Sequence, residues 1–167
     1  MKIRVNEIAE IYEYEDSCFY LGKILCSDNQ NFVFFNSISP SGDYQGWALL
    51  SLRNVERIIY STKYINFYKK VLKDNKPPLL CSNPKDFLEY CFVNKRIVEI
   101  SKFAWGDRIK YLKLISINET SVKGQTMDSY GRYGQVVTID YNHISWILFG
   151  SSINEGIEEY VSKLEDA

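Results

Sequence analysis

The stretch "FYLGKILCSDNQNFVFFNSI", residues 19–38, decides the fold class because it holds two strand-like runs around one polar turn. The runs "FYLGKILCS" and "NFVFFNSI" are short and rich in β-branched and aromatic residues, which is typical of strands. Between them, Asp28 and Asn29 are residue types that favour tight turns. The stretch therefore predicts an antiparallel hairpin.

Further runs of the same kind lie on both sides of this hairpin. Two stretches have a helical pattern instead, with apolar residues spaced i, i+3, i+7: "YINFYKKVLK" and "NEGIEEYVSKL". The other predicted strands are "EIAEIYEYE", "GWALLSL" and "VERIIYS" in the first part of the chain, and "RIVEISKF", "RIKYLKLISI", "SVKGQTM", "QVVTIDY" and "ISWILFG" in the second.

An internal repeat organises these elements. The motif "IAEI" at residues 8–11 recurs as "IVEI" at 97–100, and further identities keep the same offset of 89 positions. A small shift then aligns the two helical stretches. The identical pairs are Leu25 with Leu114, Ser27 with Ser116, Asn29 with Asn118, Val33 with Val122, Gly42 with Gly131, Tyr44 with Tyr133, and Ile58 with Ile147.

The repeat predicts two units, at residues 1–74 and 96–167, joined by a linker at 75–95. Asn83 followed by Pro84 is a helix start signal, so we expect a short linker helix at about 84–92. Five strands and a closing helix favour a small bent barrel, because closure removes exposed edges. The predicted fold is mainly β: two tandem small five-stranded β-barrels, each followed by a short C-terminal helix.

The hairpin also resembles the first signature of Sm-like proteins, which runs from a glycine through an aspartate and an asparagine into a hydrophobic strand. Gly22, Ile24, Asp28 and Asn31 follow that order, although the asparagine comes one residue early. Of the second signature, an arginine-glycine pair, only Arg53 is present.

The second unit departs further from the pattern, with Tyr111 and Ile117 in the places of the glycine and the aspartate. The resemblance implies a bent barrel of the Sm or Src-homology kind. It also implies that Asp28, Asn31 and Arg53 are the positions that would cradle an RNA base.

Composition indicates a folded protein without a strong charge field. The chain is 46% hydrophobic and 15% aromatic, and its formal net charge is −1. Recruitment of nucleic acid or of an anionic membrane would therefore need a local patch. The start "MKIRVNEIAEIYEYED" reaches acidic residues too early for a signal peptide, so we expect a cytosolic protein that does not bind membranes.

The cysteines form no metal or redox motif. They show no C-x-x-C pair and no histidine at ligand spacing, so the sequence predicts no metal and no cofactor. They are interpreted as buried thiols in a reducing compartment. The four cysteines are Cys18, Cys26, Cys81 and Cys91.

Residues that differ between the two units are the candidates for contacts with partners. The third strand carries Phe32 and Phe34 where the second unit has Ser121 and Lys123. A strand that is apolar on both faces must cover its second face, so we expect the two phenylalanines to pack against the linker helix, the other unit or a second subunit. Trp47 and Trp105 are also confined to one unit, and each is either an interface anchor or a core residue.

Two other clusters have both a functional and a structural interpretation. Tyr130, Arg132 and Tyr133 in "MDSYGRYGQ" either stack a base or form an ordinary hairpin. Asp140 and His143 in "IDYNHISW" either form an acid-base pair or lie on a surface turn. The surface turn is favoured, because residues three positions apart in a strand point to opposite faces of the sheet.

The sequence favours a non-enzymatic protein that binds another protein or associates with itself. The alternative is a binder of single-stranded RNA or DNA that uses Asp28, Asn31 and Arg53 or the Tyr130–Tyr133 hairpin. An enzyme ranks third, because no nucleophile, base or metal set stands out.

Overall fold

The computed structural model describes residues 2–14, 18–105 and 108–167, and they form two compact units. Unit one is Met1–Ser82 and unit two is Asn83–Ala167. The described residues contain ten strands, paired antiparallel, and three α-helices, so the predicted mainly β fold is confirmed.

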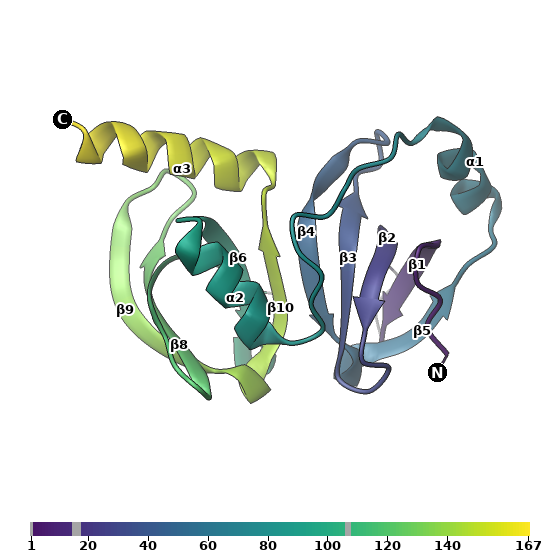
Figure 1. Cartoon of the computed structure of the whole chain (residues 1–167), viewed down its shortest axis with the longest axis horizontal. Coiled ribbons are helices and arrows are strands. Elements are labelled where there is room, and N and C mark those ends of the chain that lie inside the picture. Colours follow the sequence, from purple (N-terminus) through teal and green to yellow (C-terminus); the bar gives the residue numbers. More distant parts are fainter. Residues whose placement is uncertain (1, 15–17, 106–107) are drawn as a thin grey trace. The chain divides into compact units, whose positions relative to one another are not determined.

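Unit one is a run of hairpins whose last strand returns to the first. Its strand order is β5-β1-β2-β3-β4 (Figure 1). A 3₁₀ turn, η1 (Leu52–Asn54), joins β4 to β5. The strands are β1 (Ile8–Glu13), β2 (Phe19–Ser27), β3 (Phe32–Ile38), β4 (Tyr44–Ser51) and β5 (Val55–Ile59), and the closing helix is α1 (Lys63–Val71).

Unit two has the same arrangement after an additional helix, α2 (Pro84–Val93), and its strand order is β10-β6-β7-β8-β9. The turn η3 (Tyr141–His143) occupies the place of η1. The strands are β6 (Ile97–Lys102), β7 (Lys110–Ile117), β8 (Ser121–Met127), β9 (Tyr133–Asp140) and β10 (Ile144–Phe149), and the closing helix is α3 (Ser152–Glu165).

The closed barrels expected from the sequence are not shown, because the sheet is open. No described pairing joins β5 to β4, or β10 to β9. The sheet is nevertheless bent, since β4 and β5 lie at opposite ends of the order of unit one and only the three residues of η1 connect them. A flat sheet would separate them by about 19 Å, whereas such a turn spans about 6 Å.

Equivalent elements of the two units begin 89 positions apart. This holds for β1 and β6, β3 and β8, β4 and β9, β5 and β10, and also for the helices α1 and α3. Gly42 and Gly131 both adopt positive φ, at 92° and 78°. Each glycine lies against a tyrosine of its closing helix, Tyr68 or Tyr160, where a Cβ would come within 3.3 and 2.7 Å of the ring.

Each closing helix packs apolar residues against its own sheet, but the stripe predicted for α3 is wrong in part, because Tyr160 and Leu164 are 47% and 53% exposed and Val161 is buried instead. In unit one, Ile65 and Tyr68 of α1 pack in a cluster with Ile8, Leu21 and Ile38. In unit two, a cluster of Ile157, Val161, Ile97 and Met127 does the same. Burial of such side chains is the main source of stability for these short helices.

The helix α2 begins where the sequence signal lies. The Asn83 side chain accepts a hydrogen bond from the Asp86 amide, and Pro84 occupies the first turn. Phe87 and Leu88 are fully buried, and the Phe87 ring contacts Phe149 of β10 at a centroid distance of 5.3 Å. The helix therefore packs within unit two.

Candidate functional site

The strand β9 has an exposed edge with little protection. Within the described part of the chain it pairs with β8 and with no second strand. The side chains of Tyr133 and Val136 are 46% and 51% exposed. A bulge lies near its start, but no charged residue and no proline occurs from Tyr133 to Ile139. Natural proteins guard open edges with such residues, so this edge is available to another strand.

The strand β9 differs from β5 and β4 in the charge and the exposure of its side chains. β5 is also at an end of the strand order, but it is short and carries Glu56 and Arg57 exposed. The Arg57 guanidinium lies 4.4 Å from the centroid of the Tyr12 ring. The strand β4 is the positional counterpart of β9, and Tyr44 and Trp47, which correspond to Tyr133 and Val136, are half-buried. The exposed apolar edge is therefore particular to unit two.

The hairpin that leads into β9 is held rigid by Asp128. One carboxylate oxygen, Oδ1, accepts hydrogen bonds from the Tyr130 and Arg132 amides, both at 2.9 Å. The Tyr130 side chain projects from this turn and is 76% exposed. The predicted cluster of Tyr130, Arg132 and Tyr133 is thus a fixed turn that presents aromatic surface beside the edge of β9.

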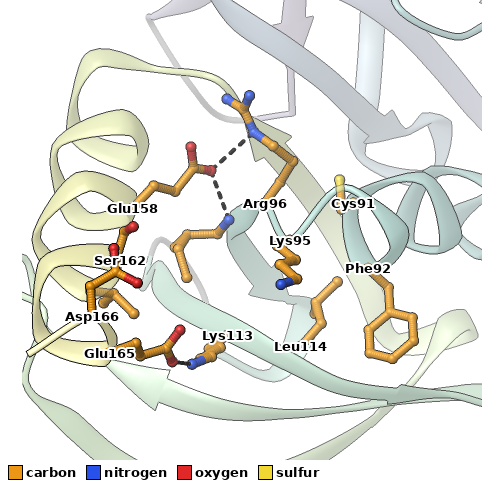
Figure 2. A pocket seen from close by; sticks show the side chains of 12 residues that line it. Cys91, Phe92, Lys95, Arg96, Lys113, Leu114, Glu158, Ser162, Glu165 and Asp166 are labelled. Atoms are coloured by element: carbon orange, nitrogen blue, oxygen red, sulfur yellow. Dashed lines mark hydrogen bonds and ion pairs between the residues drawn. The ribbon is translucent and has the colours of Figure 1, made fainter.

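A pocket of ≈ 650 Å³ lies near the start of β9. It is bounded by α3, by the turn that joins α2 to β6, and by β7 (Figure 2). Lys113 of β7 connects the pocket to β9, because its ammonium forms an ion pair with Glu165 and donates a hydrogen bond to the Tyr133 hydroxyl at 3.2 Å.

Glu158 forms one wall of this pocket. Its Oε1 accepts a hydrogen bond from the Ile97 amide at 2.8 Å and lies 3.0 Å from Nε of Arg96. Burial raises the pKa of Glu158, while the Ile97 amide and the Arg96 charge act in the opposite direction. The Glu158 side chain is 20% exposed, so this wall is only partly shielded from solvent.

Phe32, Phe34 and Trp47 lie mostly inside the protein. Phe34 is fully buried, and its ring contacts Trp47 at a centroid distance of 6.3 Å. Phe32 and Trp47 are half-buried. These rings therefore do not form an exposed contact surface, and the partner predicted to cover the second face of β3 stays a prediction.

Trp105 is half-buried at the end of η2 (Phe103–Trp105). The ammonium groups of Lys102 and Lys110 lie 4.8 and 4.4 Å from the centroid of its ring. These cation–π contacts anchor the indole within unit two.

Asp28 and Asn31 form the turn between β2 and β3. Burial would raise the pKa of Asp28, but the amides of Asn31, Gln30 and Phe32 outweigh it and hold this pKa below its usual range. The Asn31 side-chain amide also donates to Asp28 at 2.9 Å. The Asn31 carbonyl accepts from the Leu52 amide at 2.7 Å, which brings this turn next to the exposed Arg53.

Asp140 and His143 are both exposed and lie at η3. The His143 Nδ1 and the Asp140 carboxylate are 3.7 Å apart, with side chains 65% and 60% accessible. This is a surface arrangement. Among the described residues there is also no group of three or more histidine, cysteine or acidic side chains that could hold a metal ion.

The cysteines are only partly as predicted. Cys81 and Cys91 are buried, but Cys26 is half-buried and Cys18 is exposed, so the prediction of a buried thiol is wrong at Cys18.

Sequence reasoning missed the edge of β9 and the pocket. The uncharged run from Tyr133 to Ile139 was a signal for the first. No comparable signal existed for the pocket, because its residues come from segments that are distant in the sequence.

In the described part of the chain, no helix is long and apolar enough to cross a membrane. No family model matches the chain, and the searches of curated proteins and of solved structures also return no match.

Proposed function

We propose that this is a cytosolic, non-enzymatic interaction protein that associates with a second copy of itself through the edge of β9. The observation that supports this proposal is the free edge of β9. From Tyr133 to Ile139 it has no charged residue that would repel an added strand, and Val136 is exposed. Unpaired backbone groups along such an edge are a template for another strand.

A two-fold symmetric dimer would pair the free backbone groups of this edge with those of the same edge in the second copy. Two copies of β9 pair antiparallel, and each supplies the same residues to the other. Because the run is uncharged, the pairing juxtaposes no like charges. Pairing of the two edges alone would bury less accessible surface than the about 1,000 Å² that a stable interface needs. In such a dimer, the exposed rings of Tyr130 and Tyr133 would add apolar contact area to the paired edges.

The finer fold that we propose is a pair of nearly closed small barrels of the Sm or Src-homology kind, derived from one ancestral unit. The shared strand order, the 3₁₀ turns at Leu52–Asn54 and Tyr141–His143, and the offset of 89 positions between equivalent elements support it.

Sedimentation equilibrium over a concentration series tests the function. We expect the mass to rise from 19.5 kDa toward that of a dimer at millimolar protein. Val136→Lys places a charge on the edge and should keep the protein monomeric. Val71→Lys is the matched control, since Val71 and Val136 are both 51% exposed. A wild type that stays monomeric, or a Val136→Lys variant that still dimerises, would contradict the proposal.

A second candidate function, binding of single-stranded nucleic acid, rests on the hydrogen bond between Leu52 and Asn31 that places the Asp28 turn beside Arg53. Binding there should weaken steeply with salt and fall in Arg53→Ala. Association through β9 should be almost insensitive to salt, so a salt series separates the two functions.

A further inference from the structure

The pocket of unit two contains charged groups that are already neutralised within the protein. Arg96 pairs with Glu158, with Nε and Oε1 3.0 Å apart, and Lys113 pairs with Glu165. Lys95 also lines the pocket. Its ammonium forms no ion pair within 4.0 Å with any residue that the structure describes, although its charge is one of the smaller causes that lower the pKa of Glu165, after Lys113. Figure 2 shows its side chain between the α3 wall and Leu114.

The backbone of Lys95 lies in a conformation that does not suit lysine. The Lys95 amide donates to the Phe92 carbonyl at 3.2 Å and the Arg96 amide to the Cys91 carbonyl at 2.8 Å, which is the pattern of a Schellman motif at the end of α2. The motif places Lys95 at φ 53°, where glycine or asparagine is usual. Strained residues of this kind cluster at functional sites.

Unit one has a pocket in the equivalent place that lacks a charge at the position of Lys95, although Lys69 also lines it and donates to the Tyr60 carbonyl at 3.4 Å. It is smaller, ≈ 310 Å³, and Asn6 takes the position of Lys95, with a positive φ of 66°. Lys23 pairs with Asp74 at 3.1 Å, as Lys113 pairs with Glu165 in unit two. The same backbone conformation is therefore achieved with asparagine in one unit, and the lysine is specific to the larger pocket.

We infer that the pocket of unit two binds a small organic anion with an apolar body. Lys95 receives the anionic group, because the other two cations of the pocket are already paired. Leu114 and Val161 line the space for the apolar body. Asp166 also lines the pocket, so its carboxylate opposes the bound anion.

Titration with the fluorescent probe anilinonaphthalene sulfonate tests this inference, because the probe joins a sulfonate to an apolar body. We expect one saturable site in the folded wild type. Lys95→Asn keeps the backbone conformation seen at Asn6 and should weaken the probe by about tenfold. Lys123→Asn, at an exposed lysine of β8, is the control and should bind like the wild type. Equal affinity of Lys95→Asn and wild type would overturn the inference.

Two further measurements test where the probe binds. Asp166→Asn removes the opposing charge and should tighten probe binding, whereas weaker binding in this variant would show that the sulfonate does not lie near Asp166 and would contradict the inference. Amide chemical shifts should move at Ile97 and Leu114. Shifts confined to other residues, with the same thermal midpoint in all variants, would place the probe elsewhere and overturn the assignment.

Discussion

The Thr62 hydroxyl donates a hydrogen bond of 2.7 Å to the buried carboxylate of Glu10, and the same oxygen accepts one from the Ile65 amide at the start of α1. In unit two, Ser151 and Glu99 repeat the relationship at 3.0 Å, each 89 positions later. One hydroxyl thus caps the closing helix and satisfies a carboxylate of the first strand, which ties the helix to the sheet.

Thr62→Ala should destabilise the protein by about 2 kcal/mol, since it removes a helix cap and leaves the Glu10 carboxylate without one of its donors. Thr62→Ser keeps the hydroxyl and should stay close to the wild type. Urea unfolding measures both. Equal stability of the alanine and serine variants would show that the hydroxyl does not link helix and sheet.

Glu99 should make stability depend on pH. Burial raises the pKa of Glu99 above its ordinary value of 4.5, although the Ser151 hydroxyl acts in the opposite direction. The folded state therefore holds the proton more tightly than the unfolded state. This contribution is fully present below the ordinary pKa and is lost as the pH rises through the folded pKa.

Glu99→Gln removes this titration while keeping an acceptor for Ser151. The stability of the wild type relative to Glu99→Gln should therefore fall as the pH rises above the ordinary value of 4.5 and through the higher folded pKa. Urea unfolding at several pH values gives the difference, in which the other carboxylates largely cancel. A difference that is constant, or that grows with pH, would be inconsistent with a buried Glu99 carboxylate.

Lys95→Gly should stabilise the protein by about 1 kcal/mol, because glycine adopts the positive φ of this position without strain. Lys123→Gly, in the middle of β8, should instead lower stability. Urea unfolding of the two variants provides the comparison. A loss of stability in Lys95→Gly would mean that the lysine side chain supports the fold.

Much of the fold was predictable because local chemistry determines it. The period-two apolar runs predicted the strands, and Asn83 with Pro84 predicted the start of α2 at Pro84. Closure was expected from the general liability of edges, but pairing between distant strands is not encoded locally, and the sheet is open.

The candidate sites were less predictable, because exposure depends on what covers a strand. The repeat indicated that Phe34 is specific to unit one, but it did not reveal what packs against this side chain. No pattern in the sequence indicated that Val136 is exposed. The positive φ of Lys95 also has no sequence signal, since no glycine marks the end of α2.

Amide hydrogen exchange along β9 tests the central claim most directly. At millimolar protein, amides of residues 133–140 that point away from β8 should exchange more slowly than at micromolar protein, while those of Val55–Ile59 in β5 should not change. Val136→Lys should abolish the difference. If exchange along β9 is the same at every concentration in the wild type, its edge does not pair with a second copy and the proposed function is wrong.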